Sequence, residues 1–497
     1  MSNARVAVIG AGIGGLVAAA LLARRGLDVT VLERAAAPGG KMREVAIGNA
    51  RLDAGPTVFT LRGVFEEIFS EAGASLDEHI KLHPVATLAR HAWSPHERLD
   101  LYADRKRSAD AIGALAGPDE GRRYLAFCAD ARAIYRTLER TFIRASRPNP
   151  LSLVGRVGWR GLADLWRIRP FATMWRALGE HFRDARLQQL FGRYATYCGS
   201  SPFQAPATLM LVAHVEQEGV WLVDGGMHRL AQALQRVATA HGASFRFGAE
   251  VSRIEAAAGK VSGVQLADGE RLPVDAVIAN TEAAAIGRGL FGTAAATAVP
   301  RRAPATRSLS AITWSAVAKT SGFPLLRHTV FFSRDYAAEF EDIFRQRRLP
   351  ASPTVYVCAQ DRDDGDEAAA QSPERLLCLM NAPANGDVHR FTEAEVADAQ
   401  ARAFGQLARC GLQVNLSAEQ TVATTPSDFE RLFPGTGGAL YGPASHGWQA
   451  SFARPGTHTR LPGLYLAGGS THPGPGVPMA ALSGRLAAEA VLEALRQ

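Results

Sequence analysis

The sequence predicts an α/β protein in which one nucleotide-binding domain is assembled from three separate stretches of the chain. The first observation is a strand, a glycine-rich turn and a helix within Val6 to Arg34. The second is a series of short alternating strands from Ser244 to Asn280, and the third is a strand, a glycine turn and a helix after Leu461. In the first and third stretches, small residues at a strand end let a ligand lie against the backbone, where a helix N-terminus faces it.

The first stretch carries the strongest motif. Val6 to Ile9 is a short apolar, β-branched run that predicts a buried parallel strand. Gly10 permits the tight turn after it, Gly12 lets a pyrophosphate approach the backbone, and Gly15 lets the next helix pack closely on the strand. Glu33 ends the second predicted strand, where its carboxylate accepts hydrogen bonds from ribose hydroxyls. The combination predicts a Rossmann-type domain that binds a dinucleotide.

The middle stretch predicts a return to this domain. Ser244 to Asn280 alternates apolar and polar residues in three short runs, which Gly259 and the pair Asp268-Gly269 interrupt. This pattern predicts a β-meander, followed by a strand that ends at Ile278. The same order of elements occurs in flavoproteins whose second domain is inserted into the first.

Two blocks with helical patterns separate the three stretches and predict an inserted α+β substrate domain. The last stretch predicts a closing helix from about Pro478. We therefore expect nucleotide-binding segments at 1–70, 225–289 and 451–497, and substrate-domain segments at 71–224 and 290–450.

Composition excludes several classes of protein. With 47% hydrophobic and 21% charged residues among 497, the chain is an ordinary folded protein. Its five cysteines form no C-x-x-C pair, so neither a disulfide framework nor a metal site is indicated. The charged stretch Gln360 to Glu374 favours a solvated loop. The first apolar run is already the nucleotide-binding strand, which disfavours export, and no apolar run is long enough to predict a transmembrane helix.

The net charge of +7 is concentrated between Arg140 and Arg193. The arginines within this region are Arg144, Arg147, Arg156, Arg160, Arg167, Arg169, Arg176, Arg183 and Arg186. Aromatic side chains such as Trp159, Phe171 and Trp175 are interleaved with them. The pattern is consistent with a surface that lies on an anionic membrane, and equally with a solvated basic face over core aromatics. Nucleic acid is a weaker interpretation, because no recognition motif accompanies the charge.

A longer ligand than NAD is indicated by further glycines. Gly39, Gly40 and Lys41 follow Glu33 and add backbone amides and a cation near the pyrophosphate. Together with the glycine turn in the last stretch, they imply a ligand that threads the whole domain and has its reactive ring at the far end.

Four motifs carry a resemblance to a known family. They are E-R-x-x-x-P-G-G-K from Glu33, "DAGPT" from Asp53, "DGGMHRL" from Asp224, and "GLYLAGGSTHPGPGVPMA" from Gly463. In this order, over nearly the whole chain, they resemble the bacterial phytoene desaturase-type family of FAD-dependent carotenoid desaturases. "PGGKMR", "LARHAW" and "GRYATYCGSSPFQAPATLMLVAHVEQEGVWLV" are most similar to the 1-hydroxycarotenoid 3,4-desaturases, also called methoxyneurosporene dehydrogenases. The resemblance implies an amine oxidase-like two-domain flavoprotein.

The resemblance also implies a set of FAD-binding residues. Gly10, Gly12 and Gly15 would hold the pyrophosphate and Glu33 the adenosine ribose. The remaining positions would be Arg34, Gly40 and Lys41 along the same path, Val251 at the adenine, and Gly55, Gly469 and Met479 near the flavin.

In the implied reaction, the flavin takes a hydride from a carbon allylic to the conjugated chain, and a neighbouring proton then leaves. The cofactor carries the difficult step, so no strong base is required. His472 is the candidate for a polar group close to the isoalloxazine; the alternative is that it only hydrogen-bonds the proline-rich loop around it. His214 and Glu216 would face the substrate or its hydroxyl end, or else form a surface salt bridge.

The implied partners are an acyclic carotenoid, 1-hydroxylated or 1-methoxylated, and oxygen or a quinone as electron acceptor. A carotenoid is insoluble in water, which favours peripheral binding to the cytoplasmic side of an anionic membrane. The alternatives are phytoene desaturation or carotenoid isomerisation within the same family, an amine oxidase, and a prenyl-binding escort protein without flavin.

Overall fold

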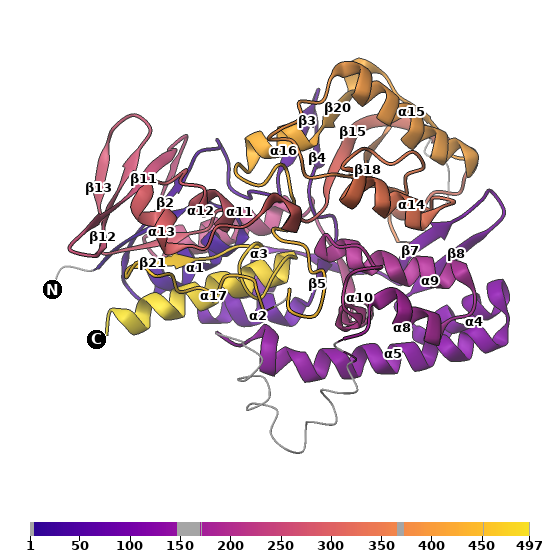
Figure 1. The fold of residues 1–497 in the computed structure, drawn as a ribbon, viewed down its shortest axis with the longest axis horizontal. Coiled ribbons are helices and arrows are strands. Elements are labelled where there is room, and N and C mark those ends of the chain that lie inside the picture. The colour runs from indigo at the N-terminus through magenta and orange to yellow at the C-terminus, as the bar shows by residue number, and fades with distance from the viewer. Residues whose placement is uncertain (1–3, 147–168, 170, 365–371, 451, 497) are drawn as a thin grey trace.

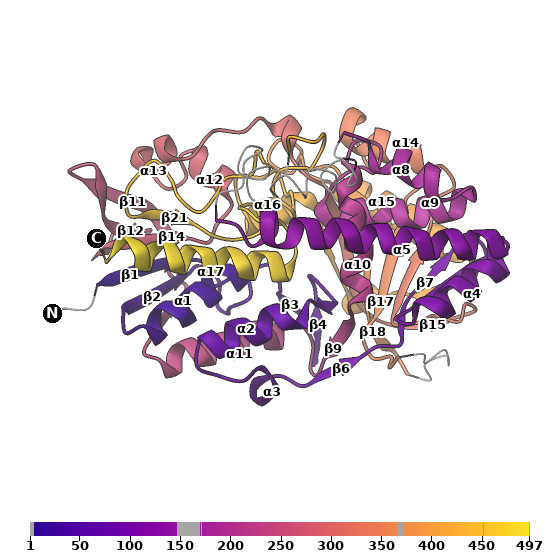
Figure 2. The same ribbon diagram turned by 90° about the horizontal axis from the view of Figure 1, so that it is seen from below.

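A computed structural model describes residues 4–146, 169, 171–364, 372–450 and 452–496. In Figure 1, a half with a parallel sheet carries both termini, and a half with a larger sheet lies opposite it. Figure 2 shows the long helix α5 (Pro118–Leu138) and the final helix α17 (Val477–Ala494) along the same side of the molecule.

The first half is built on a five-stranded parallel sheet. Its order is β10 (Ser244–Phe247), β2 (Asp28–Glu33), β1 (Arg5–Ile9), β14 (Ala276–Ala279) and β21 (Leu464–Leu466). The central strand β1 is buried from its second residue onward, as its continuous apolar run predicts. Strands from three distant stretches of the chain therefore end at one edge of this sheet.

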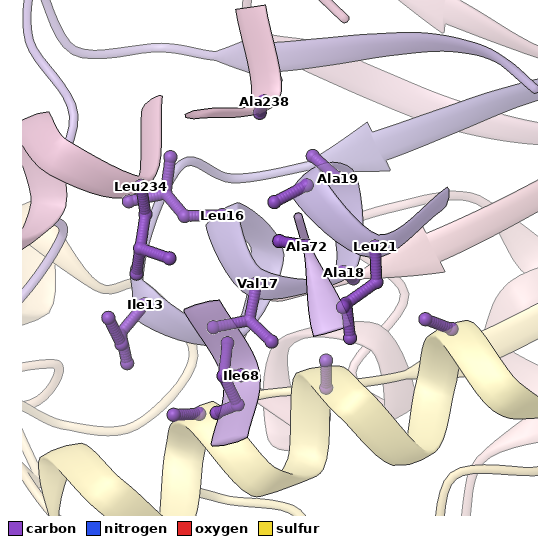
Figure 3. Packing of buried hydrophobic residues seen from close by; sticks show 14 of the residues in the cluster. Ile13, Leu16, Val17, Ala18, Ala19, Leu21, Ile68, Ala72, Leu234 and Ala238 are labelled. Atoms are coloured by element: carbon purple, nitrogen blue, oxygen red, sulfur yellow. The ribbon is translucent and has the colours of Figure 1, made fainter. Parts of the chain in front are cut away.

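Helix α1 (Ile13–Arg24) packs on this sheet and is buried from Ile13 to Ala23. It is surrounded by α17, α2 (Arg62–Glu71) and α11 (His228–Ala240), and Figure 3 shows its side chains against Ile68 and Leu234. Such a helix is apolar on all sides, and its small residues allow close approach. A Cβ at Gly484 of α17 would lie 2.0 Å from the carbonyl oxygen of Gly14, so only glycine fits there.

The predicted β-meander is present as the antiparallel strands β11 (Val251–Ala257), β12 (Lys260–Leu266) and β13 (Arg271–Pro273). The first residues of the predicted stretch do not belong to it. They form β10, which pairs in parallel with β2 at the sheet edge.

The second half contains a mixed sheet. Its strands, in spatial order, are β19 (Gln413–Asn415), β15 (Ser310–Ser321), β18 (Glu374–Ala382), β17 (Val355–Ala359), β16 (His328–Phe331), β7 (Thr87–Ala92) and β8 (Arg98–Tyr102), and β20 (Thr421–Thr424) also pairs with β15. The parallel pair β16 and β7 joins the two chain segments on either side of the nucleotide-binding strands. Both segments therefore contribute to one sheet.

The remaining elements pack on one or the other half or link the two. The helices are α3 (Leu76–His79), α4 (Arg105–Ala116), α8 (Met174–His181), α9 (Ala185–Gly192), α10 (Leu211–Gln217), α12 (Ala283–Gly287), α13 (Thr293–Ala298), α14 (Tyr336–Phe340), α15 (Glu393–Arg409) and α16 (Pro426–Leu432). The smaller sheets are β3 (Glu44–Ile47) with β4 (Ala50–Asp53), and β9 (Val220–Val223) between β5 (Phe59–Thr60) and β6 (Leu82–Pro84).

The prediction of a solvated loop over 360–374 is wrong at both ends. Arg362 and Glu374 are 4% and 2% exposed and form an ion pair with Nε and Oε2 2.9 Å apart. Gln360 is also buried, and its side chain hydrogen-bonds the backbone of Asp53. The charges of Arg362 and Glu374, which suggest a solvated loop, are paired with each other inside the protein. Residues 365–371 lie outside the described chain.

Candidate functional site

The glycine positions predicted from the first stretch lie at the carboxyl ends of β1, β14 and β21. Gly10 has a φ of +96°, and a Cβ there would lie 2.7 Å from the carbonyl oxygen of Asn280. A Cβ at Gly15 would lie 2.2 Å from the carbonyl oxygen of Gly10. These contacts confirm that the turn requires glycine for backbone conformation and for helix packing.

Two helix N-termini open onto this edge. The N-cap residues of α1 and α17 are Gly12 and Gly476, and neither helix has a capping side chain or an acidic residue in its first turn. Their first backbone N–H groups thus have no side-chain acceptor in the described chain. Such amides, together with the helix dipoles, favour a bound phosphate. The cradle fits a pyrophosphate.

Glu33 is fixed above the glycine turn. Its carboxylate accepts hydrogen bonds from the backbone amides of Ala11 (2.7 Å) and Ala35 (2.8 Å). The carbonyl of Glu33 accepts from the amide of Ala249, just before β11. Val251 is buried in the same cluster as Leu32. Glu33 and Val251 are therefore brought together at one end of the edge.

Asn280 is a site residue that the motifs do not identify. It follows β14, and its side-chain amide donates to the carbonyl of Gly10 at 3.1 Å. A Cβ at Gly12 or Gly468 would lie 2.9 or 3.0 Å from atoms of its side chain. The signal in the sequence is its place at the end of a central parallel strand, the edge at which ligands bind in such sheets.

The cations along the predicted path have different partners. Lys41 donates to the carboxylate of Glu282 (2.6 Å) and to the carbonyl of Leu440 (2.7 Å). Arg34 donates to the backbone carbonyls of Arg431 (2.6 Å) and Leu432, so its guanidinium is directed at the 431–432 segment.

Gly40 and Gly55 are packed against neighbouring backbone. A Cβ at Gly40 would lie 3.2 Å from the Cα of Gly12, and one at Gly55 would lie 1.8 Å from the carbonyl oxygen of Lys41. Gly40 therefore lies beside the glycine turn, and Gly55 lies beside the segment that follows Glu33.

The last stretch supplies the other end of the edge. Gly468 has a φ of +104°, and its amide donates to the hydroxyl of Ser483 at 2.7 Å. The carbonyl of Gly469 accepts from the buried guanidinium of Arg454 at 3.2 Å. Met479 lies in the first turn of α17. Arg454 is a second residue that the motifs do not identify.

His472 is 2% exposed, and its imidazole packs edge-to-face on Phe142, with ring centroids 5.0 Å apart. Its backbone amide donates to the carbonyl of Pro455 at 2.8 Å.

A buried polar cluster lies between the "DAGPT" segment and the large sheet. The hydroxyl oxygen of Tyr356 lies 2.7 Å from Thr57 Oγ1 and 2.8 Å from Nδ1 of His328. The guanidinium of Arg193 lies over the rings of Tyr197 and Tyr356, 5.0 and 5.5 Å from their centroids. The sequence did not single out Arg193 or Tyr356.

Glu216 belongs to this cluster, whereas His214 does not. The hydroxyl of Tyr194 donates to Glu216 Oε2 at 2.5 Å. Burial raises the pKa of Glu216, against the lowering effect of hydrogen bonds from Tyr194 and Tyr197 and of the charge of Arg193. The imidazole of His214 instead lies 3.4 Å from the carboxylate of Glu218, the residue that follows α10, and burial lowers the pKa of this histidine. Glu216 thus lies in the interior cluster and His214 beside Glu218, and a contact of either residue with the substrate stays a prediction.

Within the basic region, Arg147, Arg156, Arg160, Arg167 and Trp159 lie outside the described residues. Four described arginines form ion pairs: Arg144 with Glu67, Arg169 and Arg176 with Glu180, and Arg186 with Asp184. Met174 and Phe182 are fully buried, but Phe171 is 66% exposed and packs against Trp448, which is 39% exposed. The described part of the region is thus a mixture of core and surface.

Near Phe171 and Trp448, an open pocket of about 630 Å³ is lined by Phe203, Phe340, Phe344 and His446, among others.

Within the described ranges, no helix is both long and apolar enough to span a bilayer. Nor do three or more His, Cys, Asp or Glu side chains of that part of the chain form a metal-binding group.

The fold and the dinucleotide cradle define a class of protein. The flavin containing amine oxidoreductase family matches residues 13–492. An oxidoreductase from Methanosarcina mazei has a similar structure, with a TM-score of 0.61 at 18% identity over 98% of this chain and all of that one. Putrescine oxidase gives a TM-score of 0.59 at 15% identity, over 100% and 99% of the two chains. The chain belongs to this family and adopts its fold.

Similar proteins place the chain in a narrower group within this family. Hydroxyneurosporene desaturase of Rubrivivax gelatinosus is 56% identical over 489 residues, which cover 98% of this chain and 93% of that protein. The protein of the same name from Cereibacter sphaeroides is 44% identical over 98% and 97% of the two chains. A zeta-carotene-forming phytoene desaturase of Myxococcus xanthus is 31% identical over 98% and 94%. Within its family the chain therefore falls among the carotenoid desaturases, FAD-dependent oxidoreductases that act on CH–CH groups.

Proposed function

We propose that the enzyme introduces the C3–C4 double bond into an acyclic carotenoid that carries a hydroxyl or methoxy group on C1. The observation that carries this proposal is the 56% identity, over almost the full length, to a hydroxyneurosporene desaturase. A phytoene desaturase shares only 31% of its residues with this chain. The oxygenated substrate is therefore favoured over phytoene.

The residues at the edge of the parallel sheet would hold FAD. Gly10, Gly12, Gly15 and Asn280 would form the pyrophosphate cradle with the first amides of α1, and the N-terminus of α17 would serve the flavin end of the same edge. Glu33 would receive the ribose hydroxyls, with Val251 beside the adenine. Gly55, Gly469 and Met479 would border the isoalloxazine, and Arg34, Gly40 and Lys41 the path between.

When bound, the flavin supplies the acceptor for a hydride from the carbon allylic to the polyene. The chain's own task is to hold the C–H bond in place and to exclude water. His472 is the candidate polar group at the isoalloxazine, and its replacement by Gln should lower the rate of flavin reduction without changing FAD content.

The test is to give FAD-loaded enzyme in liposomes phytoene, neurosporene or 1-hydroxyneurosporene, each separately. A red shift of the carotenoid absorbance with the hydroxylated substrate is expected. Reaction with phytoene alone would establish phytoene desaturation, and a change of isomer without a longer chromophore would establish isomerisation. Reduction of the flavin only by simple amines would establish an amine oxidase.

We also propose that the face around Phe171 and Trp448 contacts an anionic membrane on the cytoplasmic side, and that oxygen or a quinone reoxidises the flavin. The exposed aromatic pair and the adjacent pocket support a membrane contact, because aromatic rings favour the headgroup level. Replacing Phe171 and Trp448 by Ser should weaken flotation with anionic vesicles. Unchanged flotation would contradict this membrane contact. Stopped-flow oxidation of the reduced flavin by air or by vesicle-bound quinone would identify the electron acceptor.

A further inference from the structure

Arg193 differs from Arg90, Arg362 and Arg454 because its guanidinium has neither a carboxylate nor a backbone carbonyl as acceptor in the described chain. Arg90 and Arg362 form ion pairs with Asp100 and Glu374, and the guanidinium of Arg454 donates to three backbone carbonyls. In the described parts of the chain, Arg193 has no carboxylate within 4 Å, and its one hydrogen bond runs from Nη1 to the hydroxyl of Tyr197 at 2.9 Å. With one hydrogen bond, most of the N–H donors of this partly buried guanidinium have no protein acceptor, and such donors suit a polar ligand.

The other nitrogens of this guanidinium border open space. The Arg193 side chain is half-buried, and neither Nε nor Nη2 is a fully enclosed atom, unlike the unpaired Nε of Arg43 or Arg327. Tyr197, Glu216 and Tyr356, which surround it, are also half-buried. These donors therefore face a space within the polar cluster.

That space lies beside the expected position of the flavin ring. Tyr356 contacts Arg193 through its ring and Thr57 through its hydroxyl. Thr57 is two residues from Gly55, so their Cα atoms are at most about 7 Å apart. Arg193 therefore lies one side chain away from the segment that would border the isoalloxazine.

The cluster offers both kinds of hydrogen-bonding group. Arg193 only donates, whereas the carboxylate of Glu216 only accepts: it receives hydrogen bonds from Tyr194 and Tyr197, and its lone pairs leave room for a further donor. An alcohol both donates and accepts, so it matches a guanidinium and a carboxylate together. A hydrocarbon chain end would offer neither group a further hydrogen bond.

We propose that Arg193 and Glu216 bind the hydroxyl oxygen at the end of the carotenoid and thereby select the oxygenated substrate and set the position of the reacting bond. This inference rests on the proposed function. In a 1-hydroxylated carotenoid, a single methylene separates the hydroxyl-bearing carbon from the C3–C4 bond. Because that bond must lie at the flavin, the side chain that binds the hydroxyl must lie beside the flavin as well. Arg193 satisfies that requirement.

The test compares neurosporene with 1-hydroxyneurosporene on FAD-loaded enzyme without oxygen. Two quantities are measured for each carotenoid: the rate of flavin reduction, and the equilibrium affinity from the carotenoid's spectral shift. In Arg193→Met, both should fall about 10- to 100-fold for the hydroxylated carotenoid, because a charge-assisted hydrogen bond is lost. They should change little for neurosporene. Glu216→Gln should show a smaller loss with the same selectivity.

Arg271→Met is the matched control, because Arg271 is 66% exposed on β13 and should leave both substrates unaffected. FAD content and melting temperature report folding. If Arg193→Met loses FAD, then Arg193→Lys and Tyr197→Phe, which preserve most of the packing, replace it in the same comparison.

Equal losses for the two carotenoids, or an unchanged preference in every variant, would overturn the inference. A wild-type enzyme that desaturates both carotenoids equally would refute the inference and leave desaturation standing. A wild-type enzyme that desaturates neither would refute the proposed function, and the ratio of the two affinities would still decide the role of Arg193.

Discussion

The carboxylate of Glu33, at the end of β2, accepts a hydrogen bond from the backbone amide of Ala11, 2.7 Å away in the glycine turn after β1. The same carboxylate accepts from the amide of Ala35. One side chain thus joins the two strand ends between which the adenosine ribose would lie.

Glu33→Gln should therefore weaken retention of FAD. The amide group of Gln can accept only one of the two hydrogen bonds and would turn N–H groups toward the other donor. The loss of a charge-assisted hydrogen bond corresponds to about 10- to 100-fold weaker binding. The ratio of flavin to protein absorbance after dialysis measures it. Glu270→Gln, in a surface ion pair with Arg246, should keep its flavin.

Gly15→Ala should prevent the glycine turn from closing. The new Cβ would lie 2.2 Å from the carbonyl oxygen of Gly10, which belongs to rigid backbone. We expect loss of FAD and a lower melting temperature. Gly405→Ala is the matched control: it lies in α15 with nothing near its Cβ position, and should stabilise the protein by roughly 0.5–1 kcal/mol. Equal effects of the two substitutions would contradict the close packing at Gly15.

Glu374→Gln should destabilise the substrate half strongly. It leaves the guanidinium of Arg362 buried without its carboxylate, which costs about 3–5 kcal/mol. Asp119→Asn, which removes an exposed ion pair with Arg122, should cost less than about 1 kcal/mol. Urea unfolding of the FAD-loaded variants gives both values, and a small loss for Glu374→Gln would mean that water reaches Arg362.

The stability should decrease in mild acid because of buried histidines. Burial and the charge of Arg193 lower the pKa of His91 to about 3, so the folded state keeps this imidazole neutral. Below about pH 6.5 the unfolded chain binds a proton that the folded chain does not bind. The free energy of unfolding therefore falls by up to about 1.4 kcal/mol for each unit by which the pH decreases. The contribution is complete above pH 6.5 and is lost as the pH falls toward 3.

His91→Gln should reduce this slope by about that amount between pH 6.5 and 5. Urea unfolding at several pH values measures the slope. His83→Gln, at an exposed position on β6, should leave it unchanged, and an identical slope in His91→Gln would contradict the buried neutral imidazole.

The features that the sequence predicts well are local. Gly10, Gly15 and Glu33 lie within one strand-turn-helix-strand unit, so their spacing alone indicates their roles. Asn280 comes from another part of the chain and reaches the same turn only because β14 pairs with β1. No local pattern reveals such a contact.

The substrate half was harder to predict for the same reason. Arg193, Glu216 and Tyr356 come from three elements that the fold brings together, and the sequence indicated only Glu216, with a surface alternative. Arg362 and Glu374 form their pair across a connection that composition alone describes as polar. The family motifs cover the cofactor, whereas the substrate contacts depend on long-range packing.

The position of β21 at the border of the parallel sheet has a consequence for biosynthesis. This strand and α17, which lies against α1, come long after β1 in the chain. The opening βαβ unit is therefore synthesised before the segments that complete the binding edge. That edge reaches its final form only when β21 and α17 have packed onto a unit made much earlier.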